Sequence, residues 1–194
     1  MTTDIDRNEL LELEILNHIE DSPKQTTRLL ASKIGCNLRL THALLKKLIE
    51  KGMLDVKKIN SRNWHYYLTP KGIAEKASKT YKFFEFSMHF YQQARELSSA
   101  LCARLKEEGA DKVAFFGCGH LAEIAYLSLQ ENNLTLMEVY GNTGNEFMGR
   151  PLLPFEKAVD SGADALIVCV YNRKHPKLKI LDSIGEDKVK RIFH

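Results

Sequence analysis

The 194-residue sequence has few cysteines, no long apolar run and no basic, apolar leader at its start. Its apolar runs fall far short of the roughly 20 residues that a transmembrane helix needs. The first residues, MTTDIDRNELLELEI, are polar and acidic, unlike a secretion signal. The four cysteines are scattered without a CxxC pair, a pattern that indicates neither a zinc site nor a disulfide framework. We therefore expect a cytoplasmic protein with reduced thiols, no bound metal and no membrane partner.

Net charge is low, but the positive charge is concentrated in one segment. The whole chain carries +3 at pH 7. Residues 37–71 contain eight Lys and Arg residues against two acids, so this segment carries +6 and the rest of the chain −3. A compact basic segment on a slightly acidic chain is typical of a nucleic-acid contact. A solvated charged face without a partner is the alternative.

Three short helices are predicted in the first 52 residues. Leucines recur at helical spacing over residues 8–20, and Pro23 then interrupts the pattern. A threonine, Thr26 or Thr27, can cap a second helix that stops at Gly35. The third helix follows after only the turn GCN. Two helices joined by so short a turn are typical of a helix-turn-helix.

The third predicted helix separates a buried face from a basic face. The buried face is made by residues at i, i+3, i+4 and i+7, which are Thr41, Leu44, Leu45 and Leu48. The residues that point away from it are Arg39, His42, Ala43, Lys46 and Lys47. We expect Arg39 and His42 to meet base edges in the major groove, and the two lysines to lie closer to phosphates.

Two short strands, MLDVKKI and NWHYYLT, follow around the basic tip NSRN. Helices followed by such a ribbon are the order of a winged helix-turn-helix, whose wing residues Lys57, Lys58 and Arg62 can reach the DNA backbone or minor groove. The segments LLASKIGCNLRLTHALLKKLIEKGML and YYLTPKG, with the basic hairpin between them, resemble the MarR-like winged-helix transcriptional regulators over residues 9–72. The resemblance implies binding to operator DNA.

No proline and no glycine occur in residues 73–108, which predicts one long helix or two consecutive helices. Its apolar residues form two neighbouring stripes: Phe83, Phe86, Phe90, Ala94, Leu97, Leu101 and Leu105, and beside them Tyr81, Phe84, Met88 and Tyr91. Such a wide belt must be buried, either against the chain's own domains or against a second copy. We expect a two-fold homodimer, which would place two DNA-binding helices at the half-sites of a palindromic operator.

After residue 108, strands alternate with helices. VAFFGCG reads as a strand and turn, HLAEIAYLSLQ as a helix, LTLMEVYGN as a strand and GRPLLPFEKAVDSG as a brief strand and helix. ADALIVCVYN is the apolar run of a strand buried in a parallel sheet, and HPKLKILDSIG and DKVKRIFH add a helix and a last strand. The predicted fold is an α+β winged helix-turn-helix domain (1–72), a linking and dimerising helix (73–108) and a small α/β Rossmann-like domain with a mostly parallel sheet (109–194).

The turn after the first of these strands carries a phosphate-binding pattern. Gly117, Gly119 and Ala122 fit G-x-G-x-x-G/A, in which the glycines permit a tight turn and the approach of a pyrophosphate. NAD sites usually add an acidic residue at the end of the second strand. Glu138 instead lies inside that strand, and the tip offers Tyr140, Asn142 and Thr143. The pattern indicates a phosphate site without the ribose-binding acid.

The part of the sequence after residue 108 resembles two known groups of proteins. The winged helix followed by GCGHLA resembles the redox-sensing Rex repressors, in which a Rossmann domain reads the nicotinamide redox state. The segment GRPLLPFEKAVDSGADALIVCV, after a glycine turn, resembles the small Rossmann-like domains of sugar-modifying acyltransferases. The second resemblance covers more of the domain and implies a nucleotide or nucleotide-sugar effector, with polysaccharide genes as a natural setting for the regulator.

Ligands of parallel sheets bind beyond the carboxyl ends of the strands. We therefore expect a pocket for a small phosphorylated effector at Gly117, Cys118, Gly119, His120, Leu121, Asn142, Thr143, Tyr171, Asn172 and Arg173. Arg173 would meet a phosphate, and His120 would either donate to the ligand or cap the helix. Cys118 could alternatively act as a thiol redox sensor.

The sequence predicts a dimeric transcriptional regulator whose Rossmann-like domain binds a nucleotide, dinucleotide or nucleotide sugar. We find no acid/base pair, metal cluster or nucleophile with a partner, so we expect no enzymatic activity. Three rival interpretations stay open. The first is a nucleotide-dependent enzyme that uses the winged helix only to dimerise. The second is a regulator with a ligand-free scaffold, and the third is an architectural DNA-binding protein without operator preference.

Overall fold

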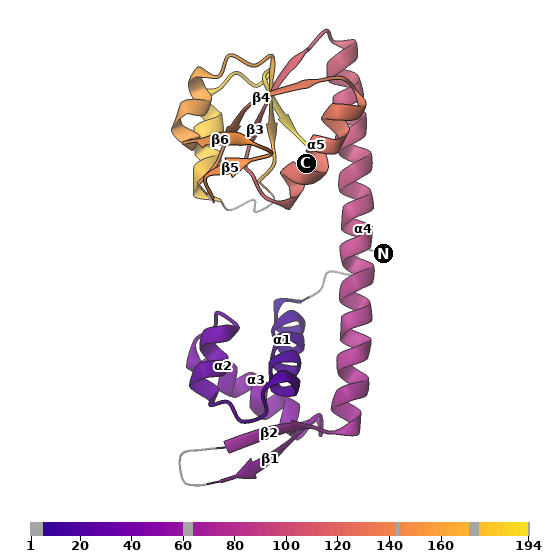
Figure 1. Cartoon of the computed structure of the whole chain (residues 1–194), viewed down its shortest axis with the longest axis vertical. Coiled ribbons are helices and arrows are strands. Elements are labelled where there is room, and N and C mark those ends of the chain that lie inside the picture. The colour runs from indigo at the N-terminus through magenta and orange to yellow at the C-terminus, as the bar shows by residue number, and fades with distance from the viewer. Residues whose placement is uncertain (1–5, 60–63, 143, 171–174, 194) are drawn as a thin grey trace. The chain divides into compact units, whose positions relative to one another are not determined.

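The computed structural model describes residues 6–59, 64–142, 144–170 and 175–193 (Figure 1). Among the predicted site residues, Arg62, Thr143, Tyr171, Asn172 and Arg173 lie outside this part of the chain. Two compact units, Met1–Met88 and His89–His194, divide inside the long helix α4 (Pro70–Glu107). The division into domains 1–72, 73–108 and 109–194 stays a prediction.

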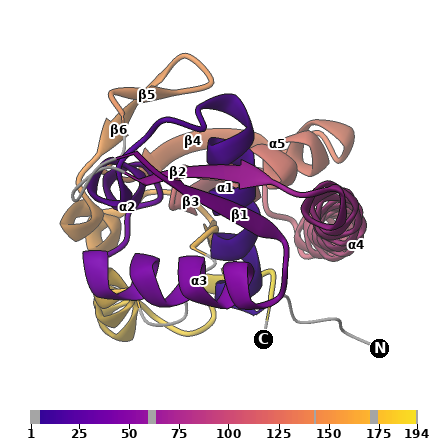
Figure 2. The same cartoon turned by 90° about the horizontal axis from the view of Figure 1, so that it is seen from below.

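The first unit is a winged helix. It contains helices α1 (Arg7–Asp21), α2 (Thr27–Lys33) and α3 (Leu38–Glu50), followed by strands β1 (Leu54–Lys58) and β2 (Trp64–Leu68). The strands pair antiparallel, with Leu54 opposite Leu68 and Lys58 opposite Trp64. In Figure 2, α1 and α3 lie beside this ribbon. Side chains from all three helices and both strands form one core, including Ile15, Leu16, Leu30, Leu48, Leu54 and Tyr66.

The helix boundaries of this unit follow from local capping. Thr26 accepts a hydrogen bond from Leu29 N, and Asn37 accepts one from Leu40 N, so each side chain satisfies an amide of the first turn. Gly35 (φ +63°) and Gly52 (φ +68°) adopt the left-handed conformation that ends a helix. The predicted buried face of α3, made of Thr41, Leu44, Leu45 and Leu48, is confirmed.

Helix α4 is continuous over 38 residues. The Thr69 hydroxyl accepts a hydrogen bond from Gly72 N at 3.0 Å and donates one to Gly52 O at 2.7 Å. A Cβ on Gly72 would lie 2.0 Å from Met53 O, so only glycine fits where the helix starts against the end of α3. Gly109 (φ +86°) follows its last turn.

The apolar belt of α4 divides into two parts. Ala94, Leu101 and Leu105 are buried in the core of the second unit. For these three residues, the belt packs against the chain's own domain, which was the first of the two alternatives. Phe90 stacks on Phe193 in the same unit, with ring centroids 5.6 Å apart. Phe86 is half-buried. The other large side chains of the belt are exposed: Tyr81, Phe83, Phe84, Met88, Tyr91 and Leu97.

The second unit is a small Rossmann-like α/β domain, as predicted. Its sheet has the order β5-β6-β4-β3-β7-β8, and every neighbouring pair is parallel except β5 and β6. The strands are β3 (Lys112–Phe116), β4 (Thr135–Tyr140), β5 (Glu146–Phe147), β6 (Arg150–Leu153), β7 (Ala165–Val168) and β8 (Val189–Arg191). Helix α5 (His120–Glu131) and the second half of α4 cover one face, and the helices η1 (Phe155–Asp160) and η2 (Pro176–Ser183) cover the other.

The sequence prediction needs two corrections here. The helices after β6 and β7 are 3₁₀ helices, with i+3 hydrogen bonds such as Lys157 N to Pro154 O and Leu178 N to His175 O. Both segments are short, and short helices favour the tighter turn. Strand β5 was not predicted, because two residues are too few to show a periodicity.

Candidate functional site

Helix α3 presents an exposed, basic face opposite its buried one. The side chains of Arg39, His42, Ala43, Lys46 and Lys47 are exposed, as are those of Lys57 and Lys58 on β1. Lys58 also lies over the ring of Trp64, with its Nζ 6.0 Å from the ring centroid. The sequence-predicted cations that the structure describes therefore lie on α3 and the ribbon, two elements of the same unit.

The two neighbouring lysines of α3 have different partners. Lys46 is 77% exposed and lies 3.6 Å from Glu50, one turn along the same helix. The Nζ of Lys47 lies 2.6 Å from Oε1 of Glu12, a carboxylate of α1 that is almost fully buried. The ion pair with Glu12 raises the pKa of Lys47 above its ordinary value. The prediction that Lys47 contacts phosphate is untested, and the structure gives its ammonium a partner inside the protein.

Sequence reasoning missed Glu12. This acid stands in the leucine-rich segment of α1, between Leu11 and Leu13, and all three are buried. The sequence did contain a signal for it, since Glu12 falls on the apolar face of a helix. A buried charge needs a partner, so an acid at such a position indicates an ion pair or hydrogen bonds within the fold.

A hollow of about 630 Å³ adjoins the exposed face of α3. It lies between the start of α2, the outer side of α3 and strand β2, and its lining includes Arg28, His42, Lys46, Trp64 and Tyr66. Tyr66 is fixed there by a 3.1 Å hydrogen bond between its hydroxyl and that of Thr27. The basic face of α3 is thus continuous with a partly aromatic hollow.

In the second unit, the glycine turn after β3 has the geometry that its sequence pattern requires. Gly117 has φ +112°, and a Cβ there would lie 2.9 Å from Val170 Cγ2. Gly119 begins α5 with an ordinary φ of −88° and no side-chain cap, and a Cβ there would meet nothing within 4 Å. Ala122 is fully buried against the sheet. Gly117 is therefore needed by the fold, whereas the position of Gly119 is open.

The residues that follow the turn do not all face a ligand. The His120 side chain is 96% exposed, with Nδ1 3.1 Å from Oε2 of Glu123. The Leu121 side chain is buried in the core, which leaves its backbone amide as the group that can face a ligand. The Ala122 amide already donates to Gly119 O at 2.8 Å. The amides of His120 and Leu121 precede it at the positive end of α5.

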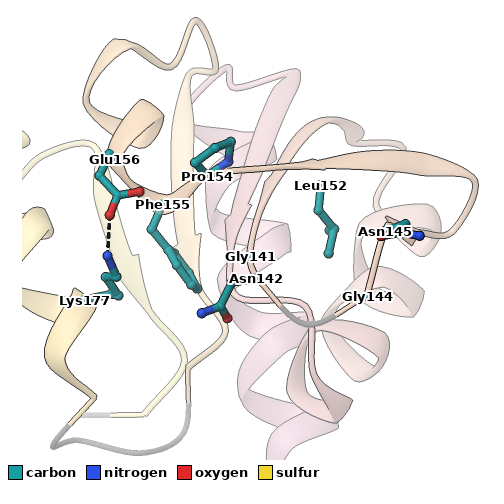
Figure 3. A pocket seen from close by; sticks show the side chains of 9 residues that line it. All are labelled: Gly141, Asn142, Gly144, Asn145, Leu152, Pro154, Phe155, Glu156 and Lys177. Atoms are coloured by element: carbon teal, nitrogen blue, oxygen red, sulfur yellow. Dashed lines mark hydrogen bonds and ion pairs between the residues drawn. The ribbon is translucent and has the colours of Figure 1, made fainter.

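A cavity of about 310 Å³ lies beyond the carboxyl end of β4 (Figure 3). It is lined by Gly141, Asn142, Gly144, Asn145, Leu152, Pro154, Phe155, Glu156 and Lys177. Asn142 is the one described residue of the predicted ligand site that lines it. The glycine turn adjoins this cavity through Cys118, because a Cβ on Gly141 would lie 2.7 Å from the Cys118 Sγ.

The two charged side chains among the described lining residues of this cavity neutralise each other. Lys177 and Glu156 form an ion pair, visible in Figure 3, and its hydrogen bond lowers the pKa of Glu156. In the same view, the side chains of Asn142 and Phe155 extend toward one place from different loops. The sequence prediction did not include Asn145, Glu156 and Lys177. Glu156 was missed because the loop after β6 was not identified as another carboxyl end of a parallel strand, whereas Asn145 and Lys177 lie beyond the residues chosen after β4 and β7.

Glu138 lies inside β4, as predicted, and its carboxylate is used within the fold. The hydroxyls of Tyr140 and Ser161 each donate to Glu138 Oε2 at 2.7 Å. Burial, together with the bond to Glu138, raises the pKa of Tyr140 to about 12. The residues after β4 are Gly141 and Asn142, so no carboxylate follows the strand directly.

Two further observations concern the described residues alone. They contain no group of three His, Cys, Asp or Glu side chains that could hold a metal ion. None of their helices combines the length and apolar character needed to cross a membrane.

No protein-family model matches the chain, and no curated protein matches it. Among solved structures, the PcaV transcriptional regulator from Streptomyces coelicolor in complex with its natural ligand is 17% identical, with a TM-score of 0.39 over 41% of this chain and 57% of that protein. A MarR family transcription regulator is 18% identical, with a TM-score of 0.40 over 47% of this chain and 66% of its own. These matches span less than two thirds of either regulator.

The structure of RSP in complex with β-NADH is similar over more of the chain. It is 12% identical, with a TM-score of 0.34 over 97% of this chain and 85% of that protein. Likenesses this distant carry no argument about function. The assignment of both folds rests on the helices and strands described above.

Proposed function

We propose that the chain is a transcriptional regulator that binds double-stranded DNA through α3 and the β1–β2 ribbon, as a MarR-like winged helix does. The exposed basic face of α3 carries this proposal. Its apolar side is buried in the core, whereas Arg39, His42 and Lys46 are exposed. DNA recognition combines base contacts in the major groove with contacts to the phosphate backbone.

Selection from a random duplex library tests this proposal. The full chain should enrich a common, palindromic sequence and bind it at least about 10³-fold more tightly than a scrambled duplex. Arg39→Ala should reduce this preference, and Lys157→Ala, on the exposed surface of η1, is the matched control. Equal binding to all duplexes would instead support the architectural alternative.

We further propose that the second unit binds a small nucleotide-type effector. The N-terminal amides of α5 would hold a phosphate, and the Asn142 and Asn145 amides would bind the sugar or base in the adjoining cavity. Among the candidate ligands, NAD suits such a site least, because no acid directly follows β4 to hold its ribose hydroxyls. A nucleotide sugar or another dinucleotide does not depend on that acid.

A thermal-stability screen with NAD, NADH, NADPH, ATP, coenzyme A and nucleotide sugars tests this second proposal. A ligand at about 100 times its Kd should stabilise the protein by about 2.7 kcal/mol. Gly119→Val should abolish the shift while leaving the unliganded melting temperature unchanged, since the position is open and its φ is ordinary. If no compound shifts the melting temperature, the unit is a ligand-free scaffold.

A homodimer through α4 is also proposed. Tyr81, Phe84, Met88 and Tyr91 follow the three- and four-residue spacing of a coiled-coil seam, and each is at least 40% exposed. A second copy would present the same stripe and cover it. Sedimentation should give twice the 22.2 kDa chain mass, and Phe84→Glu should shift it toward the monomer.

The proposal excludes catalysis. In the part of the cavity that the structure describes, the one carboxylate, Glu156, is paired with Lys177, which leaves no free acid or base beside a ligand. Prolonged incubation with any stabilising nucleotide should return it unchanged. Its conversion would favour the enzyme interpretation.

A further inference from the structure

Glu12 connects three helices of the first unit. Its side chain is 2% exposed, and its two carboxylate oxygens face different helices. Oε1 lies 2.6 Å from Nζ of Lys47 on α3, and Oε2 lies 3.1 Å from Nζ of Lys79 on α4. Lys79 is itself only 10% exposed. A single buried carboxylate of α1 therefore bridges the helix that faces DNA and the helix that carries the exposed aromatic stripe.

The electrostatics of this cluster require both lysines. Burial acts to raise the pKa of Glu12, but the ion pairs with Lys47 and Lys79 outweigh it, and the pKa lies below its ordinary value. Glu12 is thus ionised at neutral pH. Removal of one partner from a buried charge cluster leaves a charge that the protein compensates poorly, so such clusters resist rearrangement.

We propose that Glu12 is a positioning residue, which joins α3 to the first half of α4 and keeps the ammonium of Lys47 away from DNA phosphate. A displacement of α4, such as a change of packing between two copies, would then reach α3 through Glu12. The part of this inference that concerns DNA rests on the proposed function. The junction between the helices does not.

Lys46 and Lys47 form a matched pair for the DNA part of the test. A lysine that neutralises a phosphate contributes about 0.9 to the slope of log affinity against log salt concentration. Lys46→Met should lower this slope by about that amount on a duplex of random sequence. Lys47→Met should leave the slope unchanged, because Glu12 already neutralises its charge. Equal decreases of this slope for the two variants would overturn the claim that Glu12 keeps Lys47 from contacting phosphate.

Hydrogen exchange tests the junction without DNA. Lys79→Met alters α4, yet amides of α3 should exchange on the order of tenfold faster, because Glu12 loses a partner and holds Lys47 less firmly. The same change in a Glu12→Gln background should add little. Amides of α2, which belongs to the same unit but makes no ion pair with Glu12, report any loss of stability of the whole first unit. Glu14→Gln is the control at an exposed acid of α1.

The two measurements separate the possible failures. If Lys79→Met speeds exchange in α4 alone, or acts equally with and without Glu12, the junction is refuted. If the wild-type chain binds no DNA, the proposed function fails, and the exchange experiment alone decides the role of Glu12. Faster exchange in α3 that depends on Glu12 supports the junction in either case.

Discussion

The candidate sites of the two units differ in how some of their charged side chains are paired. In the winged helix, Arg39 and Lys57 are exposed and form no ion pair among the described residues. In the Rossmann-like unit, Lys177 is paired with Glu156, and Glu138 accepts hydrogen bonds within the fold. Unpaired cations suit a polyanion with regularly spaced charges, whereas a neutralised cavity favours recognition by amides. We therefore expect ligand binding at the two sites to depend differently on salt concentration.

The largest predicted effect separates the two units by salt. With about 6 to 10 phosphate contacts, affinity for DNA should fall roughly 10³- to 10⁵-fold between about 50 and about 200 mM salt. Binding of a small nucleotide to the second unit should weaken less than about tenfold over the same range, because the charged side chains among the described lining residues of its cavity already form an ion pair. Titrations of each ligand at several salt concentrations check this contrast, and two equal slopes would contradict it.

Arg39→Ala tests specificity within the winged helix. A base-edge contact contributes about 1–3 kcal/mol, so affinity for the selected duplex should fall roughly 5- to 150-fold, with a smaller loss on a scrambled duplex. The ligand-induced thermal shift should not change. A uniform loss on both duplexes would assign Arg39 to a phosphate.

Asn142 gives the corresponding test in the second unit. Asn142→Ala should weaken nucleotide binding by about 0.5–1.5 kcal/mol, the net value of a hydrogen bond. Replacing Glu156 and Lys177 together by Gln and Met should have less effect, since the pair is neutral before the ligand arrives. Isothermal titration measures both, and a larger loss in the double variant would show that Lys177 binds the ligand directly.

The smallest predicted effect concerns acid stability. The pKa of Glu12 is lowered in the folded state, so its ionised form stabilises the protein above the unfolded pKa of about 4.3. This stability is lost as the pH falls through the lowered folded value. Urea unfolding followed by the fluorescence of Trp64, the single tryptophan, should show a weaker acid dependence in Glu12→Gln. Glu156→Gln, at an exposed pair of the other unit, is the control.

In both units, the sequence predicted features that depend on short-range patterns and missed contacts that form only when separate elements pack together. The buried face of α3 was predictable residue by residue, because three leucines and Thr41 at helical spacing fix which side packs inward. The partners of Glu12 were not predictable, since Lys47 and Lys79 reach it only after three helices have packed. Local periodicity carries no information on such long-range pairs.

The candidate cavity shows the same limit. The glycine turn was recognisable, because the conformation of Gly117 and the burial of Ala122 follow from short-range geometry. Lys177 and Glu156 come together from two 3₁₀ helices whose positions depend on the order of the strands. The rule that ligands bind beyond the carboxyl ends of parallel strands finds such residues only when every parallel strand has been identified in the sequence.

We propose that a ligand of the second unit controls DNA binding by the first, because helix α4 contributes residues to both units. The most direct test is the affinity of the full chain for its selected duplex, measured with and without a saturating nucleotide that raises the melting temperature. Affinity should change by about 5- to 150-fold, the range of a coupling free energy of about 1–3 kcal/mol. Equal affinities, with the nucleotide shown to be bound, would contradict it.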